Sequence, residues 1–238
     1  MHKCLNCGEE LKGEYCYNCG QKAEVKRYSF KTLFDDIFGS LLDLDSTSVV
    51  KTFKLLATKP GAFIQSYLSG KRIDYLSPFK YLFIMLTLNI AVTWIMHKPA
   101  IEPAKVSYSP GEAHMSTQEI NLIINFILIV AMIPFAAGMK IVNRKYTLLE
   151  YYVFLIYLHS QSILFFIILQ LVLFALNITL PGASEGITWF ALFTGLYVWG
   201  FFTFFIGPVK KILLNLFASY FISILIIVIF IFSGRLLI

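Results

Sequence analysis

Long apolar runs separated by short polar segments occupy the last two thirds of the chain. Four such runs, and a fifth that is richer in aromatic residues, each reach the ~20 residues that an α-helix needs to cross ~30 Å of hydrocarbon. None has an acidic residue, Lys or Arg in its interior. We therefore predict five transmembrane helices, at about Phe79 to Met96, Ile120 to Met139, Tyr151 to Asn177, Ile187 to Ile206 and Ile212 to Phe232.

The pattern before residue 78 is amphipathic. Apolar residues recur with helical spacing between Phe30 and Leu42, which predicts one apolar stripe on a helix. A second helix is expected around Val49 to Ala57, ended by Lys59-Pro60-Gly61, and a third at Ala62 to Ser69. We assign residues 28–77 to cytoplasmic, juxtamembrane helices and residues 78–238 to the transmembrane domain.

Composition and charge agree with a membrane protein and give it an orientation. Hydrophobic residues make up 58% of the chain and charged residues 14%, with a mean hydropathy of +0.72. In the five-span arrangement, 17 of the 20 Lys and Arg residues fall on the same side as the N-terminus. Because basic residues are retained in the cytoplasm, the N-terminus is expected inside and the C-terminus outside. The charged, cysteine-rich N-terminus is not expected to act as a signal peptide.

Two Cys-x-x-Cys pairs lie close to the N-terminus. The four cysteines are Cys4, Cys7, Cys16 and Cys19. Disulfides are disfavoured in the cytoplasm, and this spacing suits a tetrahedral zinc site, with Gly8 and Gly20 permitting the tight turns. A redox dithiol and a coincidental pair are the alternatives. We predict that residues 1–27 form a zinc ribbon with structural Zn²⁺ as its cofactor.

The expected charge of this module bears on its partner. With a zinc tetrathiolate, residues 1–27 would carry a net charge of about −1, which does not favour nucleic acid. Either zinc replaces a hydrophobic core in a segment too short to build one, or the module binds a protein partner through Tyr15 and Tyr17. Nearer the membrane, Lys71 and Arg72 either anchor the topology or contact a phospholipid or a phosphorylated substrate.

Three stretches carry a resemblance to a known family. They are "YCYNCGQ" after the first cysteine pair, "TFKLLATKPG" and "YLSGKRIDYLSP". From Cys4 to about Tyr81 the chain resembles the bacterial membrane-protein family catalogued as domain of unknown function 3667. The resemblance implies a zinc ribbon followed by several spans in the bacterial cytoplasmic (inner) membrane, and no activity. By topology alone the chain is also similar to Yip1-type proteins, which have five spans.

Polar residues inside the predicted third span are the remaining candidates. His159, Gln170 and Asn177 share one helical face with Phe166. They either hydrogen-bond neighbouring helices as packing contacts or form a proton relay, a substrate path or a catalytic site, since His titrates near neutral pH. No acidic residue accompanies His159 within its own span.

Three functions follow from these observations. The favoured one is a membrane-anchored scaffold or adaptor, without catalytic residues, whose zinc module docks a protein partner while the helices contact membrane lipids. A small transporter, channel or lipid-handling protein that uses the polar face around His159 is the second. A membrane enzyme acting on a phosphorylated lipid-phase substrate is the third.

Overall fold

The computed structural model describes residues 3–25, 27–29, 31–32, 46–96, 117–178, 182–205, 210 and 212–222. Within these residues the secondary structure is helical, apart from two isolated β-bridges. The helices are α2 (Ser46–Thr58), α3 (Pro60–Leu68), α4 (Pro78–Met96), α5 (Thr117–Val142), α6 (Leu148–Ala175), α7 (Gly182–Phe204) and a C-terminal helix (Ile212–Ile222). The predicted all-α fold is confirmed for this part of the chain. Most of the amphipathic helix expected between Phe30 and Leu42 lies outside it.

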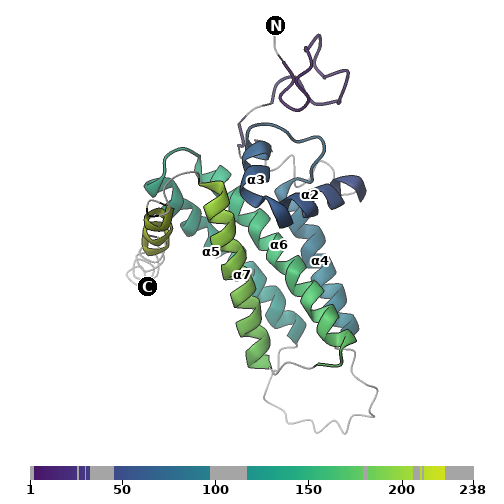
Figure 1. Cartoon of the computed structure of the whole chain (residues 1–238), viewed down its shortest axis with the longest axis vertical. Helices are drawn as coiled ribbons and strands as arrows, with labels where there is room; N and C mark the ends of the chain where they lie inside the picture. The colour runs from purple at the N-terminus through teal and green to yellow at the C-terminus, as the bar shows by residue number, and fades with distance from the viewer. Residues whose placement is uncertain are drawn as a thin grey trace, which may run out of the picture.

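The four long helices α4, α5, α6 and α7 lie side by side as a bundle (Figure 1). Helices α2 and α3 lie at the end of the bundle nearest the N-terminal cysteine segment (Figure 1). Helix α6 occupies the centre, because it packs against α4, α5 and α7 and also contacts α2 and α3. The polar segment before the spans is therefore part of the same packed structure as the bundle.

Among the described residues, three helices are long and apolar enough to cross a membrane: Pro78–Met96, Leu122–Val142 and Leu148–Ala175. They coincide with the first three predicted spans. The apolar helices Ala191–Phe204 and Ile212–Ile222 are shorter. The described residues therefore bear out three of the predicted spans by length and composition, and they do not confirm the prediction of five.

Proline and a capping box set several helix ends. Helix α2 ends at Thr58, because the residue before a proline avoids the helical conformation, and Pro60 begins α3 at its first turn. At the start of α6, the Thr147 hydroxyl accepts from the Glu150 backbone N–H, and the Glu150 carboxylate accepts from the Thr147 N–H. These local signals fix where the chain enters α3 and α6.

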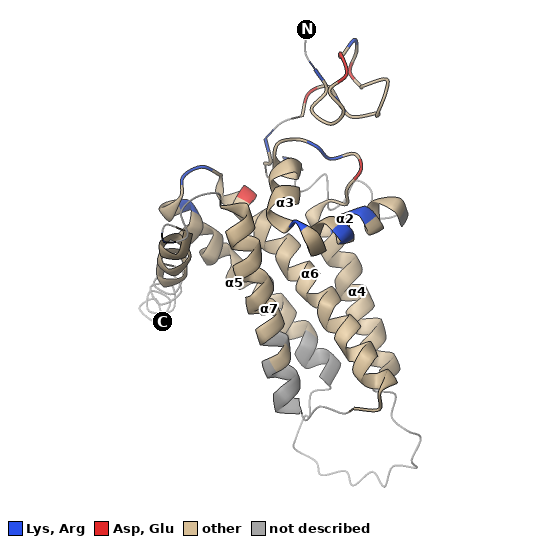
Figure 2. Cartoon of the chain, in the orientation of Figure 1, with Lys and Arg blue, Asp and Glu red and all other residues tan. Residues whose placement is uncertain are grey.

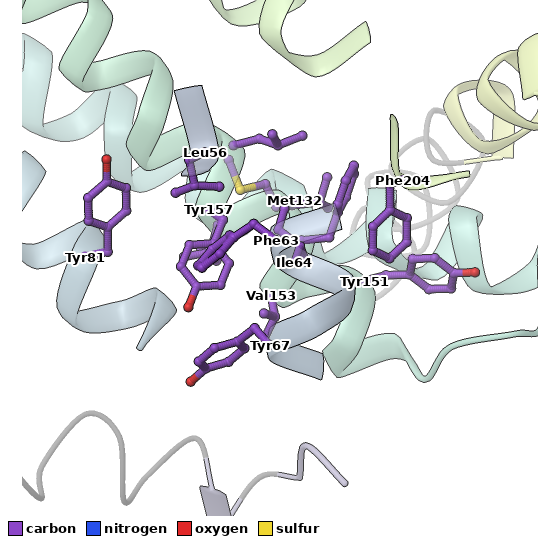
Figure 3. Close-up of a cluster of buried hydrophobic side chains, with 14 of the residues drawn as sticks. Leu56, Phe63, Ile64, Tyr67, Tyr81, Met132, Tyr151, Val153, Tyr157 and Phe204 are labelled. Atoms are coloured by element: carbon purple, nitrogen blue, oxygen red, sulfur yellow. The ribbon is translucent and has the colours of Figure 1, made fainter. Parts of the chain in front are cut away.

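An aromatic cluster joins α3 to α6 (Figure 3). The buried Tyr157 ring lies edge-on to Phe63 and Tyr67 of α3, at centroid distances of 5.2 and 5.5 Å. Its hydroxyl donates to the backbone oxygen of Leu76 over 2.6 Å. Such aromatic pairs and a satisfied hydroxyl make Tyr157 a fixed point of the core.

Two glycines allow backbones to approach closely. Gly61 of α3 lies against the backbone of Thr203 in α7, and its N–H donates to the Thr203 hydroxyl over 3.1 Å. Gly138 of α5 faces the backbone of Ser219 in the C-terminal helix, where an added Cβ would lie 2.5 Å from the Ser219 oxygen. The C-terminal helix is thereby held against α5, and α3 against the end of α7.

Candidate metal centre and its contacts with the bundle

The two Cys-x-x-Cys segments fold as repeats of one local structure. In the first, the Cys4 N–H donates to the Glu9 oxygen over 2.8 Å, and the Gly8 N–H donates to the Cys4 oxygen over 2.9 Å. The second repeats both bonds, from Cys16 to Gln21 and from Gly20 to Cys16, at 2.8 Å each. Gly8 and Gly20 have φ angles of 82° and 72°, the left-handed region that glycine adopts without strain.

This folding brings the four predicted cysteines together. Their sulfurs all lie within 4.8 Å of one another. The Cys4 and Cys19 sulfurs are 3.6 Å apart, and those of Cys7 and Cys16 are 3.5 Å apart. A tetrahedral site with metal–sulfur bonds of ~2.3 Å places its sulfurs ~3.8 Å apart. The cluster therefore fits a metal ion held by four thiolates.

The backbone also favours thiolate at one end of the cluster. The Cys7 backbone N–H, which hydrogen-bonds the Cys4 sulfur, is the main cause that lowers the pKa of Cys4 to about 7. The Gln21 N–H acts on Cys19 in the same sense, but burial and the neighbouring thiols outweigh it and raise the pKa of Cys19 to about 12. A metal cation would replace the protons shared by these crowded sulfurs.

The cysteine module, residues 3–25, rests on the loop that follows α3. Gly70 has a φ of 112°, and an added Cβ there would lie 2.8 Å from Cδ1 of Leu5 and 3.4 Å from a methyl of Val25. The Gln21 side chain is buried, and its oxygen accepts from the Arg72 backbone N–H over 3.3 Å. We call residues 70–72 the seat of the module.

The Arg72 side chain packs against two aromatic rings, one from the segment after the module and one from α3. Its guanidinium carbon is 5.4 Å from the centroid of Tyr28 and 5.5 Å from that of Tyr67 in α3. Lys71, the other predicted phosphate contact, is exposed. The geometry therefore gives Arg72 a packing partner in the chain itself, while a lipid or phosphate contact at either residue stays a prediction.

An ion pair ties the segment after the module to the start of α6. The Arg27 guanidinium donates two hydrogen bonds of 2.7 Å to the two oxygens of Glu150, and a longer one of 3.3 Å to the Lys145 backbone oxygen. The Glu150 side chain is only 3% exposed, whereas Arg27 is 59% exposed. The bond to Glu150 raises the pKa of Arg27 above its already high value, so the pair stays charged.

Of the three polar residues predicted to share one face of the third span, two are buried in α6 and the third is exposed. His159 is fully buried, with its ring edge-on to Phe193 of α7 at 5.8 Å. Gln170 is also buried, about three turns further along the helix. Asn177 is exposed beyond the end of α6 and has a φ of 54°, the conformation that terminates a helix. A functional role for these residues stays a prediction.

Sequence reasoning missed Gln161, which faces the opposite side of α6 from His159. The buried Tyr81 hydroxyl of α4 donates to the Gln161 side-chain oxygen over 2.6 Å. The Gln161 amide nitrogen is buried and has no hydrogen-bond partner among the described residues. Since 159 and 161 are two residues apart, a one-face pattern could not include both.

The contacts that seat the module were missed as well. Thr147-x-x-Glu150 is a recognisable capping box, and it could have marked Glu150 as a structural acid. No local signal connects Arg27 with a residue 123 positions away, or Gln21 with Arg72. These partners are visible only once the chain is folded.

Residues 48–89 match the family described as Protein of unknown function (DUF3667), as the sequence motifs predicted. The match runs from α2 through α3 and the seat into α4, and it does not include the four cysteines. The likeness to Yip1-type proteins finds no support. No curated protein and no solved structure matches the chain.

Proposed function

We propose that the chain is a membrane-anchored scaffold whose four-cysteine module, organised by Zn²⁺, docks a protein partner at the cytoplasmic face of a bacterial inner membrane. One observation carries this proposal. The module is seated on the helical domain and still leaves Tyr15 and Tyr17 57% and 69% exposed. Tyrosine is among the residues that contribute most to protein interfaces. A hydrogen bond to Glu9, which raises the pKa of Tyr17, helps to fix that side chain.

Zinc is the metal that best fits the donor set. Four sulfur ligands in two Cys-x-x-Cys pairs are typical of structural zinc sites, and a closed four-thiolate shell leaves no position for substrate. Its role would be to hold the two repeats together, since few apolar residues of the module are buried. In the module, zinc would thus fix the surface that carries the two tyrosines.

The distribution of charge supports the proposed orientation. Lys and Arg of the described residues gather at the end of the bundle that carries the module (Figure 2). By the positive-inside rule such an end is expected in the cytoplasm. There the thiols stay reduced and can bind metal.

The seat gives the scaffold a defined geometry. Contacts at Gly70 and Arg72, together with the Arg27–Glu150 ion pair just after the module, hold it against the bundle. A partner bound to the module would therefore lie at a fixed position relative to the membrane. Preorganisation of this kind lowers the entropic cost of binding.

The test is co-purification of the full-length tagged protein from its native membrane in mild detergent, with metal measured on the same sample. We expect about one zinc ion per chain and a partner in constant ratio to the chain. Tyr15→Ser with Tyr17→Ser should keep the zinc and lose the partner. The matched control is Lys12→Ser with Glu14→Ser, at two exposed residues of the same module, and it should keep both the zinc and the partner.

The zinc itself is tested by Cys16→Ser with Cys19→Ser, which should lose both metal and partner while the bundle stays folded. A partner that is retained by the tyrosine variant would contradict the docking surface. If no protein accompanies the intact chain, the scaffold proposal fails.

A second function, movement of a small polar solute through the bundle, is favoured by one observation. The buried Gln161 amide nitrogen has no partner among the described residues, and such a group within a span is costly unless something binds it. Reconstituted vesicles would then lose solute flux with Gln161→Leu, whereas Ser160→Ala, whose hydroxyl only bonds its own helix, would keep it. Equal flux in both variants would contradict this function.

A further inference from the structure

An apolar cavity opens between four helices of the bundle. Its volume is about 370 Å³, and it is bounded by α5, α6, α7 and the C-terminal helix. The walls include Met132 and Phe135 of α5, Phe193 of α7, and Leu216 and Phe217 of the C-terminal helix. An engineered apolar cavity of about 150 Å³ is enough to bind benzene. This cavity therefore has room for a substantially larger apolar group.

The surroundings of the cavity indicate what kind of group this is. Met132 belongs to a helix long and apolar enough to cross a membrane, and Phe217, which lines the cavity from the C-terminal helix, is 67% exposed. The cavity is thus reached from the outer surface of the bundle at the depth of a span. At that depth the medium is lipid hydrocarbon, and an acyl chain is the apolar group present at highest concentration.

Exposed basic residues lie further along two of the segments that line the cavity. Lys140 follows Phe135 by five residues on α5, or ~7.5 Å along the helix. Lys210 precedes Leu216 by six residues on the C-terminal segment, or ~9 Å. Glu150, the acid at the start of α6, is paired with Arg27. An anionic headgroup would complement this rim.

We propose that the cavity binds one acyl chain of an anionic phospholipid whose phosphate is held by Lys140 and Lys210. This lipid site goes beyond the scaffold function and does not depend on the cysteine module. It uses none of the residues that bind metal or seat the module. The bound lipid would fill the space between α5 and the C-terminal helix, which meet directly at Gly138 and Ser219.

The experiment uses the full-length protein in phosphatidylcholine vesicles that contain a trace of phosphatidylglycerol with a photoreactive acyl chain. After irradiation, mass spectrometry identifies the labelled residues. We expect labels on the cavity walls of α7 and the C-terminal helix. Ala131→Phe, which fills the cavity from α5, should abolish them, whereas Ala175→Phe, on an exposed alanine at the end of α6, should not.

The headgroup is tested separately by Lys140→Gln and Lys210→Gln, two exposed changes that leave the core intact. Each should lower cavity labelling by phosphatidylglycerol about fivefold, and labelling by a photoreactive phosphatidylcholine should not change. Equal labelling of the intact protein by both lipids would overturn the anionic headgroup. Wall labels that survive Ala131→Phe, or labels found only outside the cavity, would overturn the site.

Discussion

Replacing Arg27 by Gln should release the cysteine module from the bundle. An exposed ion pair contributes about 0–1 kcal/mol, whereas removal of one partner from a buried pair costs about 3–5 kcal/mol. The Arg27–Glu150 pair lies between these cases, because Glu150 is 3% exposed and Arg27 is 59% exposed. The Thr147 N–H also continues to hold one oxygen of Glu150. We therefore expect a loss of about 2 kcal/mol, which raises the undocked population about 30-fold.

Amide hydrogen exchange at the seat measures this directly. The Arg72 N–H donates to Gln21 of the module, so its exchange reports the opening of the contact. Peptides that cover residues 69–76 should exchange up to ~30-fold faster in Arg27→Gln, and Arg27→Lys, which keeps the charge without the paired hydrogen bonds, should be intermediate.

The control is Arg144→Gln, which removes an exposed arginine from the loop before α6. It should leave exchange at the seat unchanged, because Arg144 forms no ion pair within the described residues. If Arg27→Gln exchanges at the same rate as this control, the ion pair does not hold the module and the reasoning is refuted.

Two further changes test the fold. Gly61→Ala places a methyl group against the Thr203 backbone, which cannot rotate away. It should cost about 1–3 kcal/mol and lower the melting temperature of the protein in detergent. Gly195→Ala, in open space on α7, should not lower the melting temperature, and equal effects of the two changes would contradict the Gly61–Thr203 contact. Tyr157→Phe removes the hydroxyl that donates to Leu76 and should cost about 1–2 kcal/mol in the same melting assay; an unchanged melting temperature would show that this bond adds nothing.

The features that could be predicted from the sequence are those set by neighbouring residues. The four cysteines converge because each Cys-x-x-Cys-Gly segment closes its own turn. The first span was expected to begin at Phe79, and α4 begins at Pro78, where proline fixes the first turn. The third span was expected to begin at Tyr151, and α6 begins three residues earlier because the capping box at Thr147 starts it.

The features that could not be predicted depend on which distant segments meet. Arg72 reads in the sequence as a basic residue near a membrane, yet its guanidinium lies over Tyr28 and Tyr67. In the sequence, Gly70 predicts the end of a helix. In the structure, its missing side chain also leaves room for the Leu5 side chain of the module. Each residue has the local role that its sequence context predicts and also makes a tertiary contact. The sequence context alone gives no indication of that contact.

The family match and the structure together locate the coupling between module and membrane domain. The matched residues include the seat at Gly70 and Arg72, which contacts the module, and Gly61 and Gln65, which bond to the end of α7. They also include Tyr81, which bonds to α6. This segment therefore contacts the module on one side and two bundle helices on the other. An effect of a docked partner on the bundle would therefore have two routes, one through residues 48–89 and one through the Arg27–Glu150 ion pair.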